Sequence, residues 1–338
     1  MNVARRVLFS ATVVILSATA AAGQGLTSPQ TGIVFYTEND DWPPDTGTDK
    51  NYTNGFRLTI DKNRDVFRLH RFSMFRWVPD DEGCAEAIRD EPCISSAFHF
   101  GQQFYTPDDI SIPTLIPNDR PYAGWLYVGG SWRRGNSSRN ATTDIYLGFT
   151  GESSLAEQVQ TRWHRLVGAT KPEGWDNQIG ARLGVVLAHS RHWAVLNGVS
   201  NGHRWFELSP FIGGNVGNIM TDGYAGGRVK LGWNLTRDWT HTAIGPVAAN
   251  ADTVRPGTLE AFFSVDGRGR VVPYDVFLDA ASSHDLTRRK TVGEGAFGFG
   301  VRVGSFMATY RVALISREYE EAPRHHDFKA LRFIYVMR

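Results

Sequence analysis

The chain has 338 residues, with 36 Lys and Arg against 35 Asp and Glu and a formal net charge of +1. This balance argues against a nucleic-acid-binding protein, which would carry a basic surplus. The mean hydropathy of −0.30 is that of a soluble protein, but 10 Trp, 11 Tyr, 20 Phe and 35 Gly are many for an exported soluble domain.

Residues 1–23 are predicted to be a cleaved signal peptide. The basic opening MNVARR precedes the apolar run VLFSATVVILSATA, and AAAGQG supplies the small residues of a cleavage site. A membrane anchor is the alternative, but the apolar run is short and weakly flanked. Cleavage removes Arg5 and Arg6 and no acid, which leaves residues 24–338 as one domain with a net charge near −1.

The rest of the chain alternates between apolar and polar residues. NGFRLTID (54–61), AGGRVKLGWNL (225–235) and AFGFGVRVG (296–304) each place bulky apolar residues on one face and Gly, Arg, Lys or Thr on the other. A β-sandwich would also alternate, but the mixture of Gly with Arg and Lys favours a narrow polar lumen over bulk water. We therefore predict an all-β fold, an antiparallel transmembrane β-barrel of about 12 strands. Aromatic residues at Trp125–Tyr127 and Trp233 are predicted to form interface girdles.

The connection after the first predicted strand is rich in oxygen ligands. Acids and amides continue from the strand end into the loop, at Glu38, Asn39, Asp40, Asp41, Asp45, Asp49, Asn51 and Asn54. Hard oxygen ligands favour calcium over zinc or copper; a solvated acidic loop is the alternative. Further along, Cys84 and Cys93 lie nine residues apart in a polar loop and are predicted to form a disulfide in an oxidising compartment.

One segment, SSLAEQVQTRWHRLVGA (153–169), predicts a short α-helix inserted in the barrel. Ser154 and Glu157 form a capping-box pattern, and Gly168 is a helix stop. Apolar residues repeat on one stripe, at Leu155, Val159, Trp163 and Leu166. Gln160 and His164 lie one turn apart on a neighbouring polar face.

Several of these motifs together resemble one family. TENDD, GTDKNYTNG, NDRPYAGW, the helix pattern Q-V-Q-x-x-x-H-R-L-V-G and GWDNQ resemble the lipid A 3′-O-deacylases of Gram-negative outer membranes, in the same order from about Ile33 to the final strand. The resemblance implies a twelve-stranded barrel in the cell outer membrane that uses calcium to remove the 3′-linked acyloxyacyl chain of lipid A. It implies a carboxylic ester hydrolase whose active site lies near the outer-leaflet rim and whose partners are lipopolysaccharide and membrane lipid.

The resemblance also implies roles for particular residues. His164 would be the catalytic base that activates water, which suits a side chain that titrates near neutral pH. Asn39, Thr53 and Gln160 match other catalytic positions, and Asp40 would bind the calcium ion. Arg120 either contacts a substrate phosphate, which arginine binds bidentately, or forms a structural pair with Asp119.

The chain departs from the family pattern at three places. Thr170 stands where the family has a glutamate, so Glu173, Asp41 or Asp49 would have to replace it as a calcium ligand. A family lysine has no match at Ile110 or Ser111, and the chain ends in YVMR rather than in an aromatic residue. A catalytically silent barrel with a structural or binding role, and a barrel esterase with a serine nucleophile, are therefore the alternatives.

Overall fold

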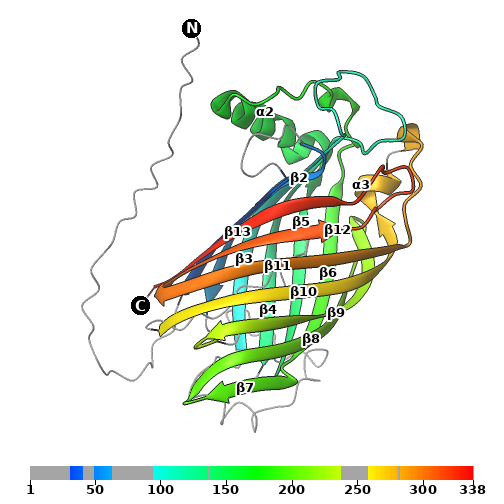
Figure 1. Cartoon of the computed structure of the whole chain (residues 1–338). Coiled ribbons are helices and arrows are strands. Elements are labelled where there is room, and N and C mark those ends of the chain that lie inside the picture. Colours follow the sequence, from blue (N-terminus) through cyan, green and yellow to red (C-terminus); the bar gives the residue numbers. More distant parts are fainter. Residues whose placement is uncertain are drawn as a thin grey trace.

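The computed structural model describes residues 31–40, 49–62, 94–135, 138–236, 258–280 and 282–337, and Figure 1 shows their arrangement. The predicted signal peptide and the predicted pair of Cys84 and Cys93 lie outside these residues. None of the helices in the described ranges is long and apolar enough to cross a membrane.

The described residues form one antiparallel sheet that closes on itself. Its strands are β1 (Thr31–Asn39), β2 (Asn51–Lys62), β3 (Ile94–Thr106), β4 (Ala123–Gly135), β5 (Arg139–Thr150), β6 (Leu183–Trp193), β7 (Leu196–Ser200), β8 (His203–Gly217), β9 (Met220–Trp233), β10 (Thr258–Asp275), β11 (Thr291–Gly304), β12 (Phe306–Ile315) and β13 (His326–Met337). β1 pairs with β13, and β6 pairs with β8. The short β7 pairs with β8 alone, beyond the end of β6. The wall therefore has twelve strand positions, which confirms the predicted barrel.

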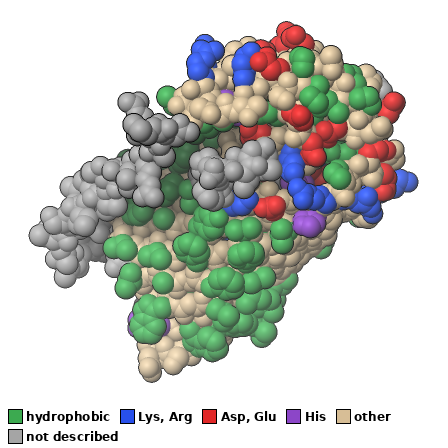
Figure 2. All heavy atoms as spheres, turned by 45° about the horizontal axis from the view of Figure 1, so that its top comes forward, with side chains coloured by type: hydrophobic (Ala, Val, Ile, Leu, Met, Phe, Trp, Pro, Cys, Tyr) green, Lys and Arg blue, Asp and Glu red, His purple; other side chains and the backbone are tan. Residues whose placement is uncertain are grey.

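The two faces of the wall differ as the alternation predicts. On β11, Phe297, Phe299, Val301 and Val303 point outward and are 44–63% exposed, whereas Arg302 is 2% exposed. β2 repeats the pattern, with Leu58 outside and Arg57 inside. In Figure 2 the hydrophobic side chains cover the outer wall, while charged side chains gather at one end. This is the surface that a strand-built membrane protein needs.

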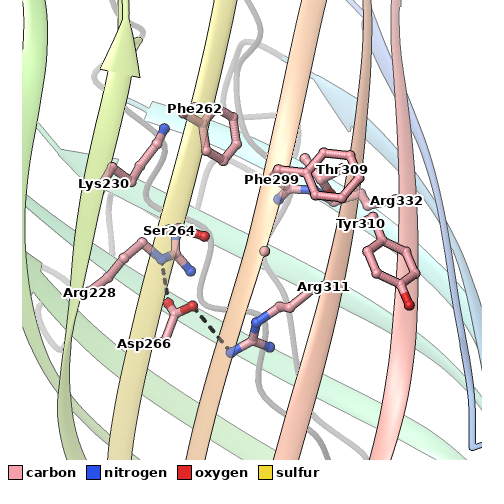
Figure 3. A pocket seen from close by; sticks show the side chains of 11 residues that line it. Arg228, Lys230, Phe262, Ser264, Asp266, Phe299, Thr309, Tyr310, Arg311 and Arg332 are labelled. Carbon is pink, nitrogen blue, oxygen red and sulfur yellow. Dashed lines mark hydrogen bonds and ion pairs between the residues drawn. The ribbon is translucent and has the colours of Figure 1, made fainter.

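Paired charges fill the lumen between β9 and β12 (Figure 3). Asp266 lies between two arginines, 2.5 Å from Nε of Arg228 and 3.4 Å from Nη2 of Arg311. Lys230 lies 4.2 Å from the ring centroid of Phe262. The space among these side chains is about 30 Å³, which is room for about one or two water molecules. This part of the lumen is packed rather than open.

The interface-girdle prediction is wrong for Trp125 and Tyr127, which are 0% and 4% exposed, but agrees with the 57% exposure of Trp233. Trp125 points into the barrel, where a Cβ on Gly184 would lie 2.4 Å from its ring. AGWLYV carries apolar residues at both odd and even positions, which point to opposite faces of a strand, so its pattern cannot show which face points inward. Lumen-facing aromatic residues near the helical end join one apolar cluster: Tyr52, Tyr105, Trp125, Tyr127, Tyr146, Phe277 and Phe328.

One end of the barrel carries the helices. The turn η3 (Gly151–Ser154) and helix α2 (Ala156–Val167) follow β5, the turn η4 (Trp175–Asn177) precedes β6, and the one-turn α3 (Val276–Asp279) and η5 (Ser282–His284) lie between β10 and β11. Thr31 of β1 pairs with Met337 of β13 at the opposite end, as Figure 1 shows. The predicted inserted helix is therefore present as α2, accompanied by a shorter one.

The capping-box prediction is wrong. Leu155, not Ser154, precedes α2, and it adopts a left-handed conformation with φ 57°. The Ser154 hydroxyl instead donates to the carbonyl of Gly151 within η3. The predicted stop is confirmed, because Gly168 has φ 75° and its N–H bonds to the carbonyl of His164.

Candidate active site

Helix α2 buries two of its polar side chains and exposes its large apolar ones. Gln160 and His164 are 5% and 4% exposed where α2 packs against β3 and β4. The predicted apolar stripe points away from the barrel, with Leu155, Val159, Trp163 and Leu166 between 39% and 78% exposed. A helix in water would show the reverse arrangement. This helix therefore presents its two candidate catalytic residues to the barrel end and an apolar surface to its surroundings.

The hydrogen bonds of His164 fix which ring nitrogen faces the site. Its Nδ1 lies 2.5 Å from the carbonyl oxygen of Thr170. A carbonyl only accepts, so Nδ1 carries a proton and donates it. Its Nε2 lies 3.2 Å from Oδ2 of Asp49, in the connection that follows β1. The structure therefore directs Nε2 toward the acid-rich connection that the sequence singled out.

Asp49 and Asp40 belong to one connected group. The backbone N–H of Lys50, next to Asp49, donates to Oδ2 of Asp40 at 2.7 Å. The N–H of Asp40 in turn bonds to the carbonyl of Thr53 at 3.1 Å. Lys329 Nζ donates to the Asp40 carbonyl at 2.9 Å, which ties the end of β1 to β13. Asp40 is itself 5% exposed.

Asn39 and Thr53 lie beside Asp40 at the barrel rim. Asn39, the last residue of β1, is 8% exposed and pairs with Asn54 of β2. Thr53 is 1% exposed, and its hydroxyl lies 2.5 Å from that of Thr106 on β3. The β2–β3 register shifts between Tyr52 and Asn54. This bulge lets two successive side chains, Tyr52 and Thr53, both be buried; the sequence carried no signal for it.

Trp175 orients Gln160. The indole Nε1–H of Trp175 donates to Oε1 of Gln160 at 2.9 Å. Since an indole N–H can only donate, the amide is fixed with Nε2 on its other side. That buried Nε2 has no hydrogen-bond partner among the described residues. Trp175 belongs to the GWDNQ motif, but a motif gives the position of a residue and not its hydrogen-bond partner.

Arg120 lies inside the rim rather than on it. It is 1% exposed, its Nη2 lies 2.6 Å from Oε2 of Glu318, and it stacks over Tyr105 at 5.1 Å. Asp119 does not pair with it: its carboxylate accepts from the N–H groups of Asp108 and Arg120 and from the Tyr319 hydroxyl. The geometry favours a bracing role for Arg120, with partners other than the expected Asp119. Its contact with a substrate phosphate stays a prediction.

The three acids that could replace the family glutamate lie in different places. Asp49 touches His164, whereas Glu173 is exposed and pairs with Lys171 at 2.7 Å. Asp41 lies outside the described residues. Among the described residues, no three His, Cys, Asp or Glu side chains form a metal-binding group. The donors at the rim are hard carboxylate, amide and carbonyl oxygens, which suit calcium because it accepts amide and backbone oxygens alongside few carboxylates.

Comparisons with known proteins found one matching family and several solved structures with some similarity. A sequence model described as "Outer membrane protein LpxR" matches residues 8–337. The solved structure of LpxR from Salmonella typhimurium matches with a TM-score of 0.69 and 18% identity, covering 90% of this chain and 99% of that one. The translocator domain of the autotransporter NalP from Neisseria meningitidis is more distant, with a TM-score of 0.39, 9% identity and coverage of 90% and 88%. No curated protein sequence matches the chain.

Proposed function

The chain belongs to the LpxR family of outer-membrane proteins, the lipid A 3′-O-deacylases, and we propose that it is a calcium-dependent ester hydrolase that removes the 3′-linked acyloxyacyl chain of lipid A. The contact between Nε2 of His164 and the acid-rich connection after β1 carries this proposal. It supplies a general base beside oxygen ligands, as ester hydrolysis requires.

The surroundings of α2 support a substrate that lies in the membrane. Its exposed stripe continues the outer surface of the wall, because Phe149 near the end of β5 and Leu183 at the start of β6 are 48% and 58% exposed. These strands lead into and out of the segment that contains α2. The helical end of the barrel then faces outward, so that α2 lies at the level of the outer leaflet and meets the acyl chains of lipid A.

His164 would activate the water. The carbonyl of Thr170 holds the ring through Nδ1, so Nε2 is left to accept a proton from a water molecule. The oxygen of that water attacks the ester carbonyl carbon at the same time. The tetrahedral intermediate then expels the sugar oxygen, which receives the proton from Nε2. The products are a free fatty acid and a sugar hydroxyl, and the imidazole returns to its starting state.

Gln160 and Thr53 would hold the reacting ester. The Nε2 group of Gln160 is buried without a partner among the described residues, and Trp175 aims it by holding the amide oxygen. A fixed amide donor of this kind stabilises the oxygen that becomes negative in the transition state. The buried hydroxyl of Thr53 is a second polar group at the rim, and the amide of Asn39 is a third.

Asp40 and Asp49 are the carboxylates that would hold calcium, with the amide oxygen of Asn39 and backbone oxygens completing the set. When bound, the ion supplies positive charge where the ester oxygen becomes negative. Asp49 thereby replaces the family glutamate, whose position is occupied by Thr170 in this chain. The contact of Thr170 with His164 is made by its backbone carbonyl and not by a carboxylate.

Two other functions are less well supported. A catalytically silent barrel was suggested by Thr170, but Asp49 provides a carboxylate at the same imidazole. A serine esterase would need a serine at the imidazole of His164, whose two ring nitrogens lie against Thr170 and Asp49. The stretch GVSNG (198–202) fits the G-x-S-x-G pattern, but it spans the end of β7 and the β7–β8 turn, at the end of the barrel away from α2 (Figure 1).

Mass spectrometry of lipid A from cells that express the protein tests the proposal. We expect lipid A to lose the mass of the 3′-linked acyloxyacyl group, and the loss to stop when a chelator removes calcium and to resume when calcium is restored. Unchanged lipid A under every condition contradicts the hydrolase, while loss that persists in chelator contradicts the calcium requirement alone.

A further inference from the structure

A second feature of the helical end lies on the wall away from α2. A groove of about 770 Å³ is lined by the ends of β10 and β11 and by the β12–β13 connection. In the strand order, β11 is five neighbours from β3, against which α2 packs. The groove is therefore on roughly the opposite side of the twelve-strand wall from His164. Its volume is in the range of small-molecule sites.

The groove is cationic. Arg289, Arg317, Arg324 and His325 line it, and none of its lining residues is an acid. Arg289 is partly neutralised, since it lies 3.1 Å from the exposed Glu320. Arg317 donates to the carbonyls of Glu320 and Ala322, and within the described residues neither Arg317 nor Arg324 forms an ion pair. Two guanidinium groups are thus available to an anion.

The floor of the groove is bare backbone. Gly269 of β10 pairs with Gly293 of β11, and both belong to the groove. A Cβ at Gly269 would meet nothing within 4 Å, and one at Gly293 only the hydroxyl of Ser316 at 3.9 Å. The absence of side chains at these two positions lets a ligand lie directly against the sheet.

The groove also lies at a defined level of the wall. Val271, one of its lining residues, is 56% exposed, and Val265 and Phe297 lower on the same strands are 48% and 46% exposed. Figure 2 shows basic side chains where this hydrophobic surface meets the polar end. In a membrane the phosphates of lipid headgroups lie at this boundary, and arginine binds phosphate through paired N–H groups.

We propose that this rim groove binds the phosphorylated headgroup of a lipopolysaccharide molecule in the outer leaflet, as a bound lipid separate from the substrate at His164. The acyl chains of that lipid lie along the apolar wall below, and its phosphate lies between Arg317 and Arg324. The choice of lipopolysaccharide rests on the proposed outward orientation of the helical end.

Native mass spectrometry of the full-length protein in detergent tests the groove. The probe is bis-phosphorylated lipid A, added to a His164→Ala background so that it is not consumed. We expect two lipid A molecules per chain. In the Arg317→Ala/Arg324→Ala double variant, the affinity for one of the two lipid A molecules should fall at least about tenfold, because charge-assisted hydrogen bonds are lost. Lys62→Ala/Arg139→Ala, which removes two charges at the other end of the barrel, should bind like the parent.

Three further probes decide the ligand. Dephosphorylated lipid A should not occupy the groove, and phosphatidylglycerol and inorganic phosphate should bind it at least tenfold more weakly than lipid A. Equal binding of phosphatidylglycerol or of phosphate alone overturns the lipopolysaccharide assignment. Undiminished lipid A binding by the double variant overturns the groove as the site. Arg324→Lys, which keeps the charge but not the paired N–H groups, should bind with intermediate affinity.

The two proposals fail in different ways. With His164 intact, the Arg317→Ala/Arg324→Ala variant should release fatty acid from detergent-dispersed lipid A within about twofold of wild type. Absence of hydrolysis by wild type contradicts the proposed function and leaves the binding measurement standing, whereas loss of hydrolysis in the double variant contradicts a groove separate from the active site.

Discussion

Nε2 of His164 lies 3.2 Å from Oδ2 of Asp49, although one residue is on α2 and the other is in the connection between β1 and β2. The carbonyl of Thr170 occupies the other ring nitrogen, so Nε2 is the position from which the imidazole can act. A water molecule that attacks an ester must take the place of this direct contact. We therefore expect Asp49 to turn from the imidazole toward calcium when the site is loaded.

Replacing Asp49 tests whether it is the missing calcium ligand. Asp49→Asn keeps the shape but removes the charge, so we expect the calcium concentration for half-maximal deacylation to rise at least about tenfold, because calcium affinity follows ligand charge. Activity titrated against free calcium measures this. Glu173→Gln is the matched control, since Glu173 pairs with Lys171 on the surface, and its calcium curve should overlay that of wild type. If instead the curve shifts for Glu173→Gln and not for Asp49→Asn, Glu173 and not Asp49 is the calcium ligand.

Trp175 is expected to position Gln160. Trp175→Phe keeps an aromatic ring against Tyr122 and Ala156 but deletes the N–H that holds the Gln160 amide. We expect kcat to fall about tenfold, equivalent to about 1.4 kcal/mol, while KM changes little. The kcat of Gln160→Leu should fall at least as far, and the double variant Gln160→Leu/Trp175→Phe should have the same kcat as Gln160→Leu alone. Additive losses would mean that Trp175 acts by another route.

The exposed stripe of α2 is expected to lie in the membrane. Leu166 is 78% exposed, so Leu166→Glu should leave the fold and the activity on detergent-dispersed lipid A intact. Deacylation in whole outer membranes should decrease severalfold, because a charge must enter an apolar layer. Gln158→Glu adds the same charge elsewhere on the helix and is the control. Equal activity of both variants in membranes would place α2 in water.

Acidification should weaken the rim around Arg120. Burial raises the pKa of Glu318, but Arg120, His326 and Arg270 together outweigh this effect, and the pKa lies below its ordinary value of 4.5. Because the folded pKa is the lower one, ionised Glu318 stabilises the fold above that value, and the contribution is lost as the pH falls through the folded pKa.

Glu318→Gln should remove this contribution, leaving Arg120 buried without its charge partner. We expect a loss of about 3 kcal/mol at neutral pH and a smaller drop in Tm between neutral and acidic pH than in wild type. Glu320→Gln removes the charge of a side chain that is 52% exposed, and this variant should behave like wild type. The measurement is the Tm of the purified barrel in detergent, taken as a function of pH for wild type and both variants. If the curves of wild type and Glu318→Gln run parallel, Glu318 makes no such contribution.

The wall of the barrel was predictable because its strands have two unlike faces. β11 alternates bulky residues with Gly and Arg, and Phe297 and Arg302 lie on the expected sides. The same reasoning fails for AGWLYV, because the neighbouring residues Trp125 and Leu126 are both apolar. Trp125 points inward because it packs into the aromatic cluster at the helical end, which the sequence pattern does not show.

The site was predictable only in part, because motif resemblance gives positions and not contacts. It located His164 and Gln160 one turn apart on a helix, but the sequence pattern does not say which side of that helix packs against the barrel. Asp49 was one of several acids in an acidic run, and only the path of the chain brings it to His164. The partner of Arg120, Glu318, lies about two hundred residues away, beyond any local pattern.

The central claim is that the imidazole of His164 activates the hydrolytic water. The rate of fatty-acid release from lipid A by the purified, calcium-loaded protein tests it most directly, with His164→Gln compared with His203→Gln, whose imidazole lies at the far end of β8 against Asn234. General-base catalysis contributes about 10²–10⁴-fold, so we expect a loss of that size for His164→Gln and a wild-type rate for His203→Gln. A folded His164→Gln protein that hydrolyses lipid A at the wild-type rate would contradict the claim.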